Sequence, residues 1–128
     1  MKISFFWKNV LGVISPHCVP ETTNEDGINL LSCLLMDDGG VPYQHTIPWM
    51  QKGIKQVDSV LSGEVESSNW GRESWGVSIT TREAKIYSLY DDEYFESIDT
   101  KQLRDALALW EFFLESKPSL EKSKDVVI

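Results

Sequence analysis

The stretch IDTKQLRDALALWEFFL, from Ile98 to Leu114, decides how this chain folds. Asp99 stands where a helix can begin, and Gln102 follows three positions later, which is the spacing of a capping box. Beyond this cap the apolar residues recur at helical spacing and form one stripe: Leu103, Ala106, Leu107, Trp110, Phe113 and Leu114. We therefore predict a helix over about residues 100–115 that packs on a sheet and stops before Pro118.

A second amphipathic helix is predicted over about residues 48–62. Apolar residues recur there at helical spacing, with lysines on the opposite side: Met50, Ile54, Val57, Val60 and Leu61. Gly63 follows and favours the end of this helix. Between the two helices, apolar and polar residues alternate around Val77 and Ile79, and again in KIYSLY (Lys85–Tyr90). This period of two predicts an antiparallel meander.

The N-terminal half gives weaker signals. Apolar, β-prone residues at 3–7 and 10–14 predict a strand, or a strand broken by a bulge at Gly12. The run INLLSCLLM (Ile28–Met36) has the length of a strand and predicts a buried central one, although leucine is equally compatible with a helix. The short, charged segment 119–128 predicts a flexible C-terminal tail.

These segments predict a single α+β domain over residues 1–118. Its centre would be an antiparallel sheet of about four to six strands, packed by the two main helices at about 48–62 and 100–115. A chain of 128 residues is large enough to bury one core and too short to divide into two stable halves.

Charge and cysteine content limit the function. Twenty acidic against twelve basic side chains give a net charge of -8, which repels nucleic acid and anionic membranes and attracts basic surfaces. We therefore expect neither direct nucleic-acid binding nor a membrane partner. Lys8 and Asn9 interrupt the apolar N-terminal run and no small-residue cleavage site follows, so we expect a cytoplasmic protein with reduced thiols.

Catalytic and metal chemistry find little support in the sequence. The only nucleophile-grade or zinc-grade residues are His17, Cys18, Cys33 and His45, and their spacing forms neither a C-x-x-C nor an H-x3-H pair. No phosphate-binding, dinucleotide-binding, nucleophile-elbow or H-E-x-x-H motif occurs. We expect no catalytic residue, cofactor or metal. The enzyme alternative is a small hydrolase that uses a thiol or two of the carboxylates in the segment 91–96.

The most distinctive surface signal is YDDEYFE, which interleaves acids with aromatic residues. Acids steer encounter with lysines and arginines, and aromatic rings supply contact area at little entropic cost. The candidate partner-binding residues here are Tyr90, Asp91, Asp92, Glu93, Tyr94 and Glu96. Further acids are expected to extend the same field: Asp37, Asp38, Glu64, Glu66 and Glu73. A plain hairpin turn whose acids face water is the alternative interpretation.

Three consecutive segments resemble a known group: WGRESWGVSI (70–79), KIYSLYDDEYFESI (85–98) and LRDALALWEFFL (103–114). They resemble the C-terminal half of small bacterial immunity proteins that protect cells from polymorphic toxins, including those of contact-dependent growth inhibition. In that group a Trp-Gly-x-Ser strand precedes a tyrosine-rich strand with an acidic end and a closing helix of the form L-x3-L-x2-W-x2-F-L. This chain matches the helix form at Leu103, Leu107, Trp110, Phe113 and Leu114.

The resemblance implies an inhibitor that is not an enzyme. Its partner would be one cognate toxin domain, a basic nuclease that forms the C-terminal part of a large secreted protein. The inhibitor would cover the active site or a basic substrate-binding surface, and would itself be a monomer or a weak dimer. An adaptor subunit of a larger assembly is the remaining alternative.

Overall fold

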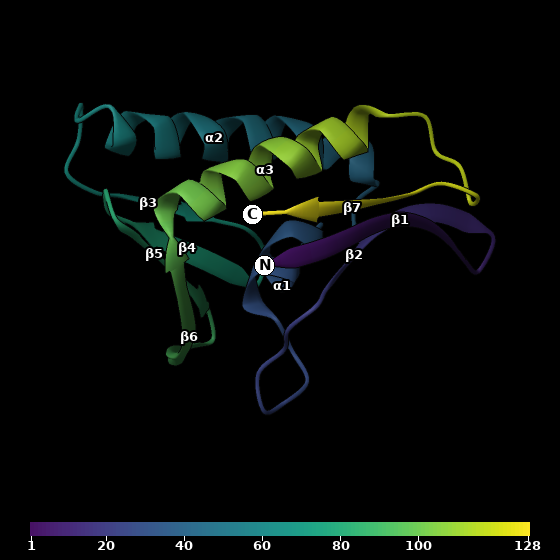
Figure 1. Ribbon diagram of the computed structural model, residues 1–128, viewed down its shortest axis with the longest axis horizontal. Coiled ribbons are helices and arrows are strands. Elements are labelled where there is room, and N and C mark those ends of the chain that lie inside the picture. The colour runs from purple at the N-terminus through teal and green to yellow at the C-terminus, as the bar shows by residue number, and fades with distance from the viewer.

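Two antiparallel sheets and three α-helices form an α+β domain, which the computed structural model describes over residues 1–128 (Figure 1). The predicted fold class is confirmed, with the strands divided between two sheets. The first sheet has the order β2-β1-β7 and the second the order β3-β4-β5-β6. The strands are β1 (Lys2–Val10), β2 (Val13–Pro20), β3 (Ser68–Gly71), β4 (Trp75–Ile79), β5 (Glu83–Ser88), β6 (Asp91–Asp99) and β7 (Ser123–Val127). The helices are α1 (Leu30–Met36), the short 3₁₀ helix η1 (Tyr43–Thr46), α2 (Ile47–Leu61) and α3 (Thr100–Glu115).

β1 and β2 form a hairpin, which corrects the prediction of one strand with a bulge at Gly12. Leu11 and Gly12 both have positive φ, 52° and 84°. Two successive residues of this kind make the tight turn that suits the twist of a hairpin, so the chain reverses where continuation was predicted. Val10 accordingly pairs with Val13.

The C-terminal segment forms β7, so the expectation of a flexible tail over residues 119–128 is wrong. β7 pairs antiparallel with β1, with Lys2 opposite Val127. Val126 is buried, and the N-terminal ammonium group donates a hydrogen bond of 2.8 Å to the carbonyl of Ile128. Burial of one valine and a full strand ladder offset the charges that suggested a loose tail.

The segment predicted as a central strand is the helix α1. The side chain of Asn29 caps the helix by accepting a hydrogen bond of 3.1 Å from the backbone N–H of Ser32. Four leucines of α1 are buried: Leu30, Leu31, Leu34 and Leu35. Their spacing fits a helical face directed at the core, and the Asn29 cap decides the helix over the strand.

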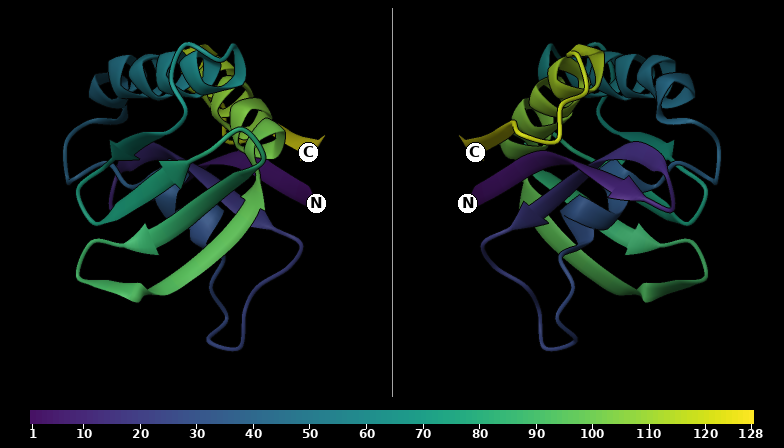
Figure 2. Two further views of the ribbon diagram at one scale, coloured as in Figure 1. Left: turned by 90° about the vertical axis from the view of Figure 1, so that its left-hand side faces the viewer. Right: turned by 90° about the vertical axis from the view of Figure 1, so that its right-hand side faces the viewer.

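The two long helices agree with prediction. α2 and α3 pack against each other, and the capping box of Asp99 and Gln102 is present at the start of α3. Aromatic rings from β1 pack on α3, with ring centroids 5.1 Å apart for Phe5 and Trp110 and 5.0 Å apart for Trp7 and Phe113. The helices thus lie over one side of both sheets. Figure 2 shows that no helix covers the opposite face of the four-stranded sheet.

Candidate partner-binding face

The acidic stretch begins in a turn and continues as the edge strand β6. Tyr90 occupies the two-residue turn between β5 and β6 and is 81% exposed. Asp91, Asp92 and Glu93 are all exposed at the start of β6. The register shifts here, because Asp91 pairs with Ser88 while the next pair along the ladder joins residues 95 and 87. Residues 92–94 have no partner on β5 and form a bulge, so Asp92 and Glu93 lie outside the ladder of paired residues.

The uncovered face of the four-stranded sheet carries aromatic residues beside these acids. One row runs across all four strands, pairing Gly71 with Gly76, Gly76 with Tyr87 and Tyr87 with Phe95. A Cβ on Gly76 would lie 3.1 Å from the Tyr87 ring and 3.0 Å from Leu89, so both side chains lie across the glycine. Phe95 is half exposed. These residues give the uncovered side of the sheet an apolar centre, and we call this side the open sheet face.

Lys85 brings a positive charge into contact with this row of residues. Its Nζ lies 4.3 Å from the centroid of the Phe95 ring, within the range of a cation–π contact. The lysine therefore covers part of an aromatic ring that would otherwise be open to solvent. Acids still dominate the rim of the face, since Asp91, Asp92 and Glu93 have no cationic partner within 4 Å.

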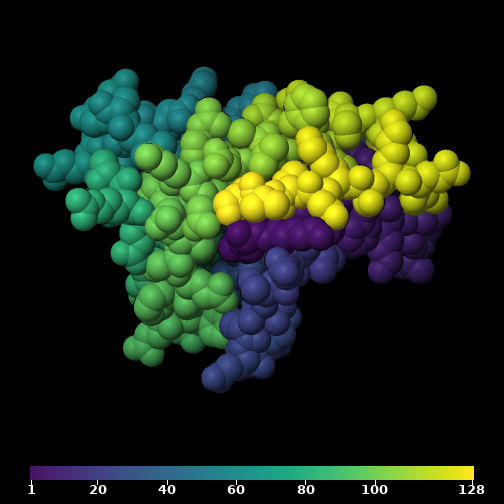
Figure 3. Space-filling view, in the orientation of Figure 1, coloured from purple at the N-terminus to yellow at the C-terminus, as the bar shows by residue number.

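Tyr94 is engaged within the chain. Its hydroxyl donates a hydrogen bond of 2.8 Å to Asp26 and accepts one of 2.9 Å from the amide of Asn24. The amide lowers the pKa of Tyr94, but the bond to Asp26, burial and nearby carboxylates outweigh it and raise the pKa. Tyr94 thus fixes the loop 21–28 beside β6. In Figure 3 the loop (blue) and β6 (green) lie next to each other at the bottom of the molecule.

This loop contributes acids that sequence reasoning missed. Glu25 and Asp26 are exposed on it, next to the start of β6. The polar run ETTNEDG gave no sign of this position, because residues 24 and 94 are joined only by tertiary contact. The acidic rim therefore has members from two distant parts of the sequence: Glu25, Asp26, Asp91, Asp92 and Glu93.

Glu96 lies on the inner face of β6. It pairs with the fully buried Ile86, and its Oε1 atom is buried without a hydrogen-bond partner. Burial raises the pKa of the Cys33 thiol, and the charge of Glu96 adds to that rise, which places the carboxylate on the α1 side of the sheet. Glu96 is thus separated from the exposed acids of the rim.

Of the remaining predicted acids, Asp37 is bound within the chain, whereas Asp38 and Glu73 are exposed, and Glu64 and Glu66 are exposed in the α2–β3 connection. The Oδ2 atom of Asp37 accepts hydrogen bonds from the backbone N–H groups of Ser74 and Trp75, at 2.7 and 3.1 Å, so Asp37 holds the β3–β4 turn. Asp38 accepts a hydrogen bond from the N–H of Gly40 within its own loop. The exposed Glu73 shares an end of the sheet with Tyr90, since the N–H of Leu89 donates to the carbonyl of Ser74.

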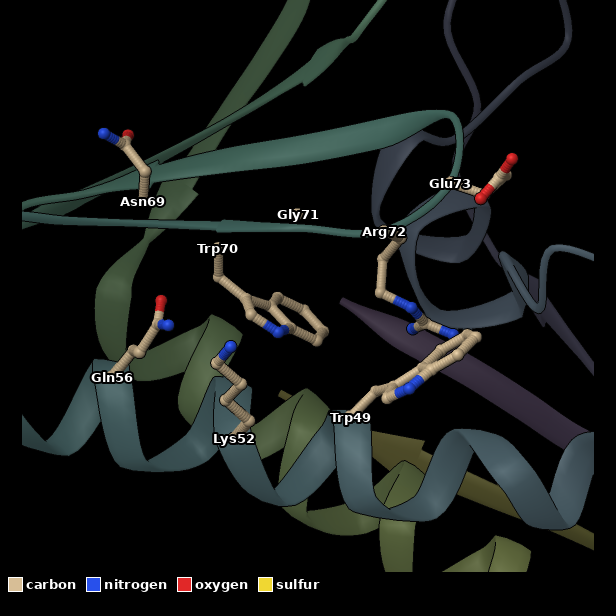
Figure 4. Close-up of a pocket in the computed structure, with 8 residues that line it drawn as sticks. All are labelled: Trp49, Lys52, Gln56, Asn69, Trp70, Gly71, Arg72 and Glu73. Atoms are coloured by element: carbon tan, nitrogen blue, oxygen red, sulfur yellow. The ribbon is translucent and has the colours of Figure 1, made fainter.

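Arg72 organises the hollow beside this end of the sheet. Its guanidinium lies 5.5 Å from the ring centroids of both Trp49 and Trp70 (Figure 4). It donates hydrogen bonds to carbonyls at the end of α1, including that of Leu34 at 2.9 Å and that of Asp37. Burial lowers the pKa of Arg72 to about 10, against the opposing pull of the Asp37 and Asp38 carboxylates. A fixed cation at this helix end satisfies otherwise free carbonyls.

A cavity of about 320 Å³ opens next to Arg72, between α2 and the edge strand β3. Lys52 and Gln56 line it from the helix, and Asn69 lies at its strand side (Figure 4). From the sequence, the lysines of α2 were expected only on the side of the helix opposite its apolar residues. The contacts of Arg72 make this region a structural junction of α1, α2 and the β3–β4 turn.

The thiols and histidines are not arranged as a nucleophile with its base. Burial raises the pKa of Cys18 to about 12, with Cys33 as the second cause, whereas a reactive thiol needs a lowered pKa. Burial and Lys8 lower the pKa of His17, whose ring nitrogen lies 3.3 Å from the hydroxyl of Ser15. His45 is exposed on η1. No group of three or more histidine, cysteine or acidic side chains is placed to hold a metal ion.

Comparison with known proteins adds no relative. No family model, curated protein or solved structure matches this chain. None of its helices combines the length and the apolar character needed to cross a membrane. The geometry of the open sheet face and its acidic rim is therefore the basis for the functional argument.

Proposed function

We propose that this chain is an immunity protein that binds and neutralises a cognate toxin domain, a nuclease, without being an enzyme itself. The toxin would be the C-terminal part of a large secreted protein of the contact-dependent growth inhibition type. The inhibitor would act in the cytoplasm and cover the toxin's active site or its basic substrate-binding surface. The resemblance in residues 70–114 supplies this class of partner.

One observation carries the proposal: the aromatic open sheet face is left uncovered, and Asp91, Asp92 and Glu93 at its border make no ion pair. Exposed apolar faces of this kind are commonly covered by a partner. Tyr87, Leu89 and Phe95 would form the apolar centre of the contact, and Tyr90 would anchor at its edge. The rim acids lie where the polar border of an interface is expected.

The charge of the rim fits a nuclease surface. A nuclease is basic where it holds the phosphates of its substrate, and carboxylates can occupy the same lysines and arginines. Such a contact forms rapidly through electrostatic steering and weakens as salt screens the charges. Since Asp91, Asp92 and Glu93 make no ion pair within the chain, they are free to pair with a partner.

The test is growth of cells that express the toxin segment, together with wild type or with the triple variant Asp91→Asn, Asp92→Asn, Glu93→Gln. The toxin segment is the C-terminal part of a large secreted protein encoded directly upstream. We expect wild type to restore growth and the variant to fail, with affinity for the purified segment reduced at least about tenfold. Far-UV circular dichroism would establish that the variant is folded.

A matched control removes three other exposed acids: Glu64→Gln, Glu66→Gln and Asp105→Asn. It changes the net charge by the same amount away from the rim, so it should protect cells as wild type does. Equal loss in both triple variants would refute a localised rim contact. A segment that is not toxic, or toxicity that wild type does not relieve, would refute the immunity function.

A further inference from the structure

A small cavity lies where the end of α3 meets the start of β7, and we call it the lysine cavity. It has a volume of about 220 Å³. Its lining includes three aromatic and three basic side chains: Trp7, Phe112, Phe113, Lys117, Lys122 and Lys124. Figure 1 shows the segment between α3 and β7 (yellow) at the end of the molecule away from β6. The lysine cavity is therefore separate from the acidic rim and the open sheet face.

The inner wall of the lysine cavity is aromatic. Trp7 and Phe113 are 3% and 5% exposed, and their rings are stacked with centroids 5.0 Å apart. Phe112, the next residue on α3, is 66% exposed. Two rings are thus held in place by the core, and the third stands at the mouth of the cavity. A wall of this kind favours contact with another planar ring.

Three ammonium groups belong to the mouth of the cavity. Lys117, Lys122 and Lys124 are exposed, and none of them forms an ion pair with a carboxylate within 4 Å. The Nζ atom of Lys124 lies 4.9 Å from the centroid of the Phe112 ring, which keeps this charge beside the aromatic wall. No acidic side chain lines the cavity, in a chain whose net charge is -8.

The acids that are close in sequence do not neutralise these lysines. Asp125 is their neighbour in β7, but successive residues of a strand face opposite sides. Its carboxylate accepts a hydrogen bond of 2.5 Å from Ser4 and lies 3.6 Å from the Nζ atom of Lys2. Glu115 and Glu121 are exposed and do not line the cavity. The ammonium groups therefore repel one another without a counter-ion from the chain, and a bound anion would relieve this repulsion.

The end of α3 accounts for one of the three lysines at most. Lys117 follows the helix, and a cation near a helix C-terminus interacts favourably with the last carbonyls. Lys122 and Lys124 come from a different segment. Lys124 pairs with the fully buried Phe5, so strand pairing directs its side chain to the side of the sheet that faces α3. An aromatic wall with a few convergent polar groups is typical of a small-molecule site.

We propose that the lysine cavity binds a small organic anion that carries an aromatic ring, with an aromatic carboxylate as the simplest member of this class. The ring would lie against Trp7 and Phe113, and the carboxylate would meet the ammonium groups at the mouth. A cavity of about 150 Å³ accommodates benzene, so about 220 Å³ has room for two fused rings and not for a drug-sized molecule. The proposal does not depend on the toxin partner.

Isothermal titration calorimetry of the full chain with 2-naphthoate tests the site. We expect a Kd on the order of 100 μM at low salt for a ligand of this size, and weaker binding as salt screens the charges. The alcohol 2-naphthalenemethanol has the same rings without the charge, so it should bind at least about tenfold more weakly. No binding of 2-naphthoate up to about 5 mM, or equal affinity for the alcohol, would overturn the proposal.

Charge variants test whether the three lysines act at the site. The triple variant Lys117→Gln, Lys122→Gln, Lys124→Gln should bind 2-naphthoate at least about tenfold more weakly than wild type. A matched control replaces three exposed cations elsewhere on the surface: Lys55→Gln, Arg82→Gln and Lys101→Gln. It changes the net charge by the same amount and should bind as wild type does. Far-UV circular dichroism would establish that both variants are folded. Equal loss in the two variants would refute the lysine cavity as the site.

The indole N–H signals in assigned heteronuclear NMR spectra locate the ligand. Trp7 lines the lysine cavity, whereas Trp49 lines the separate cavity next to Arg72. Addition of 2-naphthoate should shift the Trp7 signal and leave the Trp49 signal in place. A shift of Trp49 without a shift of Trp7 would assign the binding to the other cavity and refute the proposal.

Discussion

Replacement of Gly53 by alanine has two opposing effects on the stability of the fold: it favours the helix, and it crowds a neighbouring side chain. Gly53 lies inside α2, where alanine is preferred over glycine by about 1 kcal/mol. A Cβ at this position would lie 2.7, 2.9 and 2.9 Å from three atoms of the Trp70 ring. The helix alone therefore predicts stabilisation, and the packing against β3 predicts the opposite.

The packing effect should be the larger one. Trp70 is 4% exposed, and the Arg72 guanidinium lies 5.5 Å from its ring centroid, so the ring cannot simply move away. Overpacking of a filled core costs about 1–3 kcal/mol. After subtraction of the helix preference, Gly53→Ala should lower the free energy of unfolding by about 1 kcal/mol. Urea unfolding followed by far-UV circular dichroism measures this change independently of tryptophan fluorescence.

Two comparisons isolate the clash. In a Trp70→Leu background the ring is gone, so Gly53→Ala should stabilise by about 1 kcal/mol, which gives a coupling of about 2 kcal/mol between the two positions. Gly71→Ala, where nothing lies within 4 Å of the new Cβ, should be neutral or stabilise the strand by about 0.5 kcal/mol. Stabilisation by Gly53→Ala in the wild-type background would refute the close packing of α2 on Trp70.

Three further predictions concern other contacts. Arg72→Met leaves carbonyls at the end of α1 without donors and should cost about 2–3 kcal/mol in urea unfolding; equal or greater stability would mean that desolvation of the guanidinium outweighs its bonds. The hydrogen bond from Ser4, and then a nearby lysine, lower the pKa of Asp125, so its contribution to stability is present above about pH 4 and lost as pH falls through the folded-state pKa. Hydrogen exchange of β7 amides should accelerate in that acidic range, after correction for intrinsic exchange rates, and the Asp125→Asn variant should lack this pH dependence. Because burial raises the pKa of Cys18 to about 12, this thiol should react with a disulfide reagent at pH 8 far more slowly than in urea, and a native rate equal to the unfolded one would contradict its burial.

Local signals explain which elements were predicted. The cap at Asp99 and Gln102, together with the apolar stripe behind it, specifies α3 within a single stretch of chain. Period-two alternation likewise specifies the meander that became β3 to β6. In each case the deciding residues lie within a few positions of one another, so the local sequence carries the information.

The errors arose where distant residues decide. Leucines in α1 suit a strand or a helix, and β7 exists only because β1 provides its ladder. Within the candidate site, the sequence predicted the acids of β6 but not their neighbours from the loop 21–28. It also did not reveal that Glu96 faces inward or that Asp37 is bound to the β3–β4 turn.

The α+β class, the two long helices, the meander and the acidic, aromatic character of the segment 90–96 could all be predicted without the structure, because caps, periodicity and charge are local properties. Which of those residues share one exposed surface depends on the tertiary structure. Pairing with β5 sets which side of the sheet each β6 side chain faces, and Tyr94 joins the loop 21–28 to the same rim. Arg72 fixes the end of α1 across 35 to 38 positions of sequence. Such contacts depend on the position of the whole chain, which no short segment specifies.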